Sequence, residues 1–253
     1  MVRLFDTMLK RMTLRRWQQA AEAAAEAPLE DLRQMRAAAR ALRRPLDSVI
    51  REAEYRLSLP IIGSNPIRKP PGTDWAWRPD PWRGRIPVPG HAGLTDGSQI
   101  CDGAALFHDC RLSELTLRQI RNNRADDIAP FGLRIEVFRF AGSFLSLSLD
   151  LPDEPARGLR LRHLVRIDVK AEFEKPIKIF ARLNVRHGPN LEQMLREMPP
   201  EQDHASAEFD LAYSSINETR IEKVWVDLIL DRPEMNAVIL RDVTMTRRPR
   251  ADL

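Results

Sequence analysis

The sequence predicts a mainly β protein: an antiparallel jelly-roll β-sandwich that follows an N-terminal α-helical segment and a Pro/Trp-rich arm. Two observations support this. Apolar residues alternate with polar ones through most of residues 93–250, and they recur at helical spacing through residues 1–59. Successive side chains of a strand point to opposite faces, so the alternation predicts strands with one buried face. Several such strands without helical crossovers predict antiparallel pairing.

Residues 1–59 are predicted to form two or three helices in an up-and-down arrangement. Apolar residues at spacings of three or four form three stripes, one before Pro28, one between Pro28 and Pro45, and one between Pro45 and Pro60. Proline lacks a backbone N–H and does not fit a helix interior, so Pro45 is predicted to end the second helix and Pro60 the third.

Residues 1–16 combine an apolar arc with five basic residues and the single acid Asp6. An amphipathic helix of this kind could lie on an anionic membrane surface or dock on a protein partner. The arc lasts only about three turns at 3.6 residues each, and Arg15 and Arg16 rotate onto it. Docking on the protein's own sandwich or on a partner helix is therefore the favoured interpretation.

Residues 60–92 form the Pro/Trp-rich arm. This segment contains eight prolines together with Trp75, Trp77 and Trp82. Closely spaced prolines exclude a helix in this segment and favour an extended, partly polyproline-like chain. We expect the arm to lie along the β domain with some tryptophan rings buried on it. The alternative is an aromatic platform for a sugar or a peptide.

Residues 93–250 are predicted to contain eight to ten strands separated by Gly, Pro and Asp turns, as in a two-sheet sandwich. The predicted strands lie near residues 98–108, 113–121, 131–140, 143–151, 163–173, 176–186, 205–214, 222–231 and 237–247.

One helix is predicted among these strands, from Asn190 to Met198, after a turn at Gly188 and Pro189. Asn190 would be its N-cap. Arg186 and His187 would lie beside the helix N-terminus, which could bind an anion. A turn and cap without a ligand is the simpler interpretation.

The composition excludes some functions. The net charge of +4 comes from residues 1–59, and the rest of the chain is balanced, so no nucleic-acid partner is expected. Cys101 and Cys110 lack the partners of a metal site, and no metal or other cofactor is expected. The first residues carry charges without the apolar core of a signal peptide. We therefore expect a cytoplasmic protein with reduced thiols, the alternative being one disulfide across a hairpin.

Two candidate catalytic groups are present. Glu208 and Asp210 would lie on one strand face, about 6–7 Å apart, which suits glycoside hydrolysis. The segment faintly resembles the acidic strand motif of a jelly-roll glycosidase family, but it lacks that motif's third acid, so a solvated strand face is the simpler interpretation. In the run from His108 to Cys110, neighbouring side chains would point to opposite faces, which argues against a nucleophile–base pair.

The best candidate ligand-binding residues are Arg182, Asn184, Arg186, Trp225 and Asp227, which alternate outward on two predicted strands. Such polar groups form hydrogen bonds with sugar hydroxyls, and an indole stacks on a sugar ring. If the two strands are neighbours, these side chains form a carbohydrate cleft. If the indole instead packs under the tryptophan-rich arm, the same residues are structural.

The run from Val224 to Thr246 resembles the last two strands of galactose-binding-like, carbohydrate-binding jelly rolls. The segments 142–152, 182–190 and 208–213 together resemble an uncharacterised bacterial family without an assigned function. The first resemblance implies a non-catalytic binding module with a glycan ligand, which is our leading hypothesis. The alternative is an interaction or assembly protein that docks through residues 1–16, and a glycosidase or lyase-like enzyme ranks third.

Overall fold

The computed structural model describes residues 2–58, 67–111, 113–124, 126–201 and 203–250. Its contacts divide the chain into two compact units, residues 1–50 and residues 51–253.

The first unit is helical, as predicted. Helix α1 spans Val2–Ala23, and α2 spans Leu29–Ser58. The predicted helix end at Pro45 is wrong, because α2 continues through this residue. The flanking Ala, Leu and Arg residues favour the helix strongly enough to outweigh one missing backbone N–H. Of the helices in the described part of the chain, none is long and apolar enough to cross a membrane.

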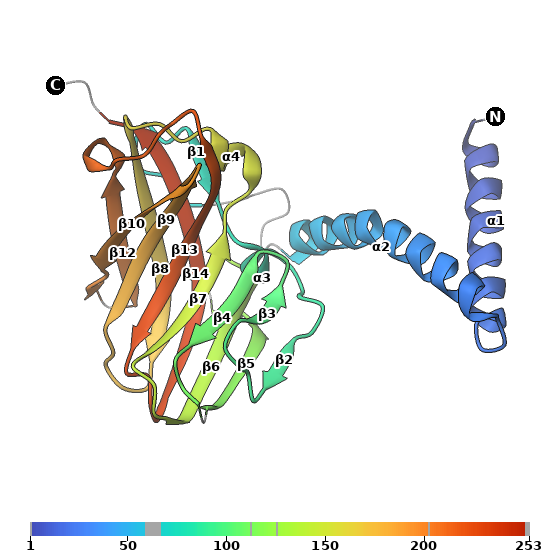
Figure 1. The fold of residues 1–253 in the computed structure, drawn as a ribbon, viewed down its shortest axis with the longest axis horizontal. Coiled ribbons are helices and arrows are strands. Elements are labelled where there is room, and N and C mark those ends of the chain that lie inside the picture. Colours follow the sequence, from blue (N-terminus) through green and yellow to red (C-terminus); the bar gives the residue numbers. More distant parts are fainter. Residues whose placement is uncertain (1, 59–66, 112, 125, 202, 251–253) are drawn as a thin grey trace. The chain divides into compact units, whose positions relative to one another are not determined.

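The second unit contains two antiparallel sheets (Figure 1). Sheet A has the order β11-β12-β8-β14-β6-β5-β2, and β1 also pairs with β14. Its strands are β1 (Trp75–Trp77), β2 (Gly90–Ala92), β5 (Ser113–Arg121), β6 (Phe131–Phe140), β8 (His163–Phe173), β11 (Pro200–Glu201), β12 (His204–Asp210) and β14 (Asn236–Pro249). Sheet B has the order β10-β9-β13-β7-β4-β3. Its strands are β3 (Ser98–Cys101), β4 (Ala104–His108), β7 (Phe144–Asp150), β9 (Ile179–His187), β10 (Asn190–Glu197) and β13 (Ile221–Asp231).

The chain passes repeatedly from one sheet to the other. Strands β6, β8, β12 and β14 belong to sheet A, while β7, β9 and β13, which alternate with them along the chain, belong to sheet B. As a result β14 lies between β8 and β6, and β13 lies between β9 and β7. This crossing pattern is the jelly-roll arrangement of a sandwich, so the predicted fold class is confirmed.

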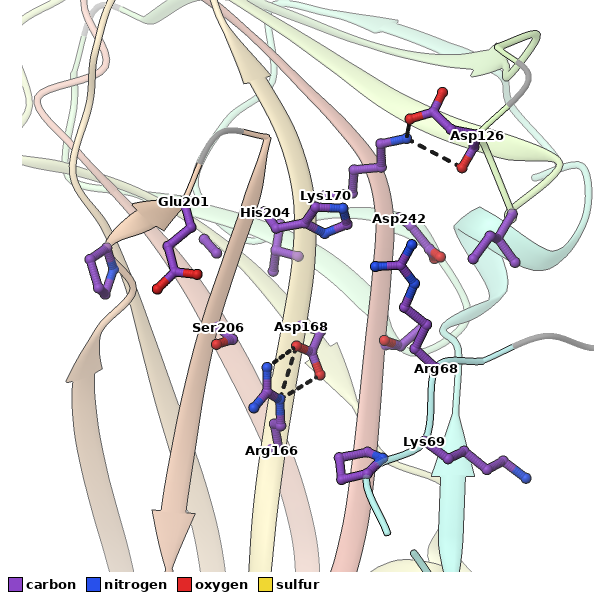
Figure 2. Close-up of a pocket in the computed structure, with 16 residues that line it drawn as sticks. Arg68, Lys69, Asp126, Arg166, Asp168, Lys170, Glu201, His204, Ser206 and Asp242 are labelled. Atoms are coloured by element: carbon purple, nitrogen blue, oxygen red, sulfur yellow. Dashed lines mark hydrogen bonds and ion pairs between the residues drawn. The ribbon is translucent and has the colours of Figure 1, made fainter.

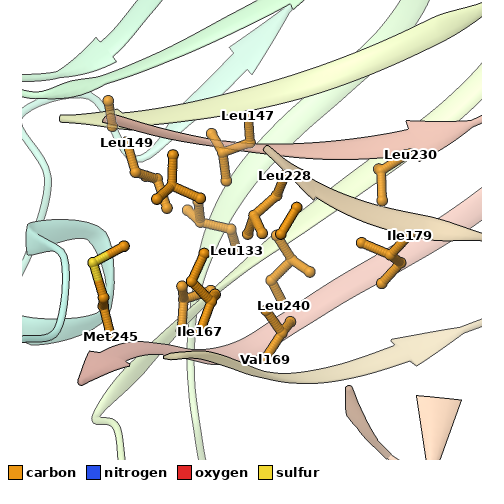
Figure 3. Close-up of a cluster of buried hydrophobic side chains, with 14 of the residues drawn as sticks. Leu133, Leu147, Leu149, Ile167, Val169, Ile179, Leu228, Leu230, Leu240 and Met245 are labelled. Atoms are coloured by element: carbon orange, nitrogen blue, oxygen red, sulfur yellow. The ribbon is translucent and has the colours of Figure 1, made fainter. Parts of the chain in front are cut away.

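The core fills the space between the two sheets, and Figure 3 shows its centre. Leu133 and Ile167 from sheet A meet Leu147 and Leu228 from sheet B, and all four are buried. Each such side chain contributes about 1.5–3 kcal/mol when it leaves water. The period-two alternation supplies these residues to one face of every long strand.

The predicted helix from Asn190 to Met198 is wrong: residues 190–197 form strand β10. This strand pairs with β9 through a tight hairpin, in which Asn190 opposes His187 and Gly188 adopts a φ of +61°. Glycine accepts this left-handed conformation without strain. Because no helix begins at Asn190, the proposed N-cap and the anion site beside it are also wrong.

Two further strand predictions need correction. The single strand predicted over residues 98–108 is a hairpin of β3 and β4, which Gly103 reverses with a φ of +73°. The strand predicted to end at residue 214 ends at Asp210, whose side chain caps a short 3-10 helix, η1 (Leu211–Tyr213). Local turn chemistry at these points outweighs the alternating pattern.

The described part of the arm, residues 67–92, packs on sheet A. The rings of Trp75 and Trp77 stack at 6.3 Å, and Trp82 is fully buried, with its Nε1 donating to Leu240 O at 2.9 Å. The arm is not wholly extended as predicted, because residues 80–83 form the short helix α3. Proline is accepted in a first helical turn, where its missing N–H would have no partner anyway. Residues 60–66 lie outside the described residues.

We predict that Trp82→Ala lowers the free energy of unfolding by about 3–5 kcal/mol, because it removes a fully buried ring and leaves a cavity. Chemical denaturation of the full chain measures this change. Trp75→Ala is the matched control on the same arm, and its half-buried ring should give a smaller loss. Equal losses in the two variants would contradict the conclusion that Trp82 is the main anchor of the arm.

Candidate functional site

The outer face of sheet B contains a groove of about 640 Å³. Its lining comes from strands β3, β4, β7, β13 and β9, which lie side by side in the sheet (Figure 1). The residues on this face alternate with core residues on the same strands, so the strand register decides which side chains meet in the groove.

The register places one row of side chains across the sheet. Arg182 on β9 pairs with Asp227 on β13, which pairs with Ser148 on β7. The row continues through Ala105 on β4 to Gln99 on β3. Because cross-strand neighbours lie about 5 Å apart, these five residues form a continuous strip along the groove floor.

Asp227 is the centre of a hydrogen-bond network. Its Oδ2 accepts from Arg182 Nε at 3.0 Å, Arg182 Nη2 at 2.9 Å and Asn184 Nδ2 at 2.9 Å. Asn184 Oδ1 in turn accepts from Gln193 Nε2 at 2.8 Å on strand β10. Asn184 is fully buried and Asp227 is 4% exposed, so both lie on the predicted face but are covered by their neighbours. Their direct effect is to hold the guanidinium of Arg182 in place.

Trp225 lies half-buried in the next row, opposite Asn184 on one side and Asp150 on the other. The guanidinium of Arg186 lies 5.8 Å from the indole centroid, and Lys223 Nζ lies 5.6 Å from it. These cation–π contacts restrict the orientation of the ring. The described arm packs on sheet A, so the alternative in which it covers Trp225 is wrong for those residues.

The five predicted residues come together because β9 and β13 are neighbours. Arg182, Arg186, Trp225 and Asp227 line the groove, and Asn184 supports them. The sequence analysis missed the residues that β7 and β4 supply. A signal for β7 was present, since its serines and Asp150 are the polar members of the alternating run.

Ser146 on β7 is the most informative of the residues missed. It lines the groove and is 2% exposed, and its Oγ has no hydrogen-bond partner within the described residues. A buried hydroxyl without a partner is unfavourable by about 1–3 kcal/mol. Phe107 on β4, which is 40% exposed, is its direct cross-strand partner, and Phe144 lies two residues before it on β7; both line the groove. The groove therefore offers an unused polar group beside exposed apolar rings.

Sheet A has a concave surface of its own, of about 790 Å³, which Figure 2 shows. Its charged groups largely neutralise one another: Arg166 pairs with Asp168, and Lys170 pairs with Asp126 and Asp127. Burial acts to lower the pKa of Lys170, but the two aspartates outweigh it and raise this pKa, so the ammonium stays charged. The groove on sheet B also contains ion pairs, Arg182 with Asp227 and Lys223 with Asp150, but it adds the aromatic rings and the unpaired hydroxyl described above.

The candidate catalytic carboxylates Glu208 and Asp210 do not reach the groove, whereas His108 and Asp109 are part of its lining. Glu208 pairs with Arg248 at 3.0 Å, and Asp210 pairs with Arg250 at 3.5 Å, both on sheet A. His108 lies against backbone groups, with Nε2 3.1 Å from Leu94 O. In the described ranges, no group of three His, Cys, Asp or Glu side chains could hold a metal ion.

The fold and the groove define a class: a β-sandwich protein with a preformed polar and aromatic groove across one sheet. Over residues 1–253 the sequence matches the model of a family of unknown function, DUF6478, and the chain belongs to that family. No curated protein matches it.

Among solved structures, the chain is similar to the enzymatically active domain of bacteriophage CBA120 tailspike protein 4, at 7% identity and a TM-score of 0.40, over 60% of this chain and 21% of that chain. It is also similar to a family 11 carbohydrate-binding module from Clostridium thermocellum, at 11% identity and a TM-score of 0.36, over 65% and 99% of the two chains. A third similar structure is the CBM22-1 xylan-binding domain from Paenibacillus barcinonensis Xyn10C. Its sequence identity is 10% and its TM-score is 0.36, and the match covers 64% of this chain and 94% of that chain. At TM-scores this low, the likeness supports no conclusion about ligand or activity.

We predict that Asp227→Ala lowers the free energy of unfolding by about 1–2 kcal/mol, because it removes the carboxylate acceptor of the buried Asn184 amide, which keeps only its bonds to backbone carbonyls, and releases a partly exposed Arg182. The matched control is Asp231→Ala on the same strand, whose carboxylate has no partner in the described part of the chain and should change stability by about 0.5 kcal/mol or less. Equal effects in urea denaturation would contradict the central position of Asp227.

Proposed function

We propose that the protein is a non-catalytic binding module that holds a carbohydrate chain in the groove of sheet B. The observation that supports this best is the combination of a fixed guanidinium, a half-exposed indole and an unpaired hydroxyl in one groove, supplied by Arg182, Trp225 and Ser146.

The chemistry of sugars matches this combination. A pyranose has an apolar C–H face that packs on an aromatic ring, and its rim of hydroxyls accepts and donates hydrogen bonds. Polar groups that are already fixed lose little conformational entropy on binding, which favours affinity. Arg182 meets this condition, because Asp227 holds two of its nitrogens.

The size of the groove favours an oligosaccharide over a single sugar. Five neighbouring strands at about 4.8 Å spacing span roughly 19 Å from β3 to β9. The volume of about 640 Å³ lies within the range of small-molecule sites. Exposed aromatic rings lie at separate points of this length, with Phe107 on β4 and Trp225 on β13. Successive sugar rings of one chain could therefore pack on different parts of the groove.

The two other hypotheses from the sequence have less support. The enzyme hypothesis depends on Glu208 and Asp210, which are held in arginine pairs on the opposite sheet. The docking of residues 1–16 on a membrane or partner stays a prediction, because the side chains of residues 2–10 lie outside the description. Met12 and Leu14 of this segment are exposed at 68% and 60%.

Trp225→Ala tests the proposal most simply. We expect the variant to fold normally and to lose about ten- to thirtyfold in affinity for the glycans that a glycan array selects, because stacking on an indole contributes about 1–2 kcal/mol. Isothermal titration calorimetry measures the affinity. Trp77→Ala on sheet A is the matched control and should bind normally. An unchanged glycan affinity in Trp225→Ala would contradict the proposal.

Ser146→Ala separates binding from stability. In the free protein the hydroxyl has no partner among the described residues, so its loss should leave the melting temperature unchanged or raise it. If a sugar hydroxyl bonds to it, affinity should still fall by about three- to tenfold. Ser206→Ala, on sheet A, is the control for both measurements. A fall in stability without a change in affinity would show that Ser146 has a structural role only.

A further inference from the structure

Helix α2 has an apolar seam with a strict heptad spacing. Its members are separated by three and four residues in alternation, which are the a and d positions of a coiled coil. They are Leu32, Met35, Ala39, Leu42, Leu46, Val49 and Ala53. The repeat covers three heptads of the helix. Pro45 falls at a g position, beside the seam, so it does not interrupt the apolar contacts.

Within the first unit, the seam from Ala39 to Val49 is exposed, whereas Leu32 and Met35 are half-buried. Leu42, Leu46 and Val49 are exposed at 43%, 60% and 67%. Single exposed leucines are ordinary, but a contiguous stripe of them marks an interaction surface. The seam is narrow where arginines flank it at positions 36 and 43, and Ile50, which is 53% exposed, widens it only beyond Val49. A helix that lies in a membrane surface needs a wider apolar arc, whereas a narrow a/d stripe fits a partner helix.

We propose that the partner is α2 of a second copy of this chain, in parallel orientation. In a parallel pair, position g of one helix faces position e of the next heptad of the other. This places Asp31 opposite Arg36 of the second copy, twice per dimer. In the described structure neither residue has an ion-pair partner within its own chain, whereas Arg43 is already paired with Asp47 at 3.0 Å.

Charge disfavours the antiparallel alternative. An antiparallel pair brings e positions together and g positions together. Arg36 would then face Arg43 of the other copy, and Asp31 would face Glu52. Like charges in such positions are destabilising. The parallel dimer is therefore the arrangement that the sequence of α2 selects.

Sedimentation of the full-length protein tests the dimer. We expect a dimer at a protein concentration of tens of micromolar, and at least a hundredfold weaker association for Leu46→Asp, which places a charge in the seam. Ala41→Asp introduces the same group on the opposite face and should dimerise normally. Far-UV circular dichroism checks that the variants stay folded. The proposal is overturned if the unmodified protein is a monomer, which is the result expected when α2 packs within its own chain. It is also overturned if the two variants weaken dimer association equally.

Two variants test the parallel orientation. Leu42→Cys places a thiol at a d position, which meets its own symmetry mate only in a parallel pair, so oxidation should yield a covalent dimer. Asp31→Arg should weaken association about three- to tenfold, and Asp31→Arg combined with Arg36→Asp should restore it. The parallel arrangement is overturned if Leu42→Cys still dimerises but does not form a covalent dimer on oxidation. It is also overturned if the double variant does not recover the association strength of the unmodified protein.

Discussion

The alternation of apolar and polar residues on strand β13 is the constraint on which the rest of the sandwich depends. Its inward residues, among them Val226 and Leu228, fill the core, while Trp225 and Asp227 point to the groove. A shift of register by one residue would exchange the two faces and bury the charge in the apolar core. Core packing therefore also fixes the position of the groove residues, because β13 lies between β9 and β7 at the centre of sheet B.

Asp227 connects this constraint to the chemistry of the groove. A carboxylate that is only 4% exposed needs several donors, and Arg182 and Asn184 supply them. The requirement to satisfy a buried charge thus orients a guanidinium at the groove surface before any ligand arrives. In contrast, Ser146 Oγ stays unsatisfied within the described residues, which leaves a hydrogen bond for a ligand to make. In the function that we propose, the fixed cation and the unused hydroxyl are the groups that bind the hydroxyls of a sugar.

Much of the fold could be predicted from the sequence, because long strands such as β8 follow the period-two pattern over most of their length. The predictions of secondary structure are wrong where local sequence preferences and long-range strand pairing favour different conformations. Strand β10 has ordinary helix-forming residues and becomes a strand only because β9 offers it a partner, and α2 passes Pro45 because its neighbours favour the helix. The shared face of the five candidate residues could be predicted, but the burial of Asn184 and the position of Ser146 in the groove depend on which strands are neighbours, and a single sequence does not contain that information.

The most direct test of the account is a two-dimensional 1H–15N NMR titration of the protein with oligosaccharides that a glycan array selects. The account predicts that the indole N–H of Trp225 and the side-chain amides of Gln193 and Asn184 shift with one common binding curve, together with backbone signals of β7 and β13. Signals from the concave surface of sheet A, such as those of Ser206, should stay unchanged. Shifts confined to sheet A, or the absence of any glycan that perturbs the groove, would contradict it.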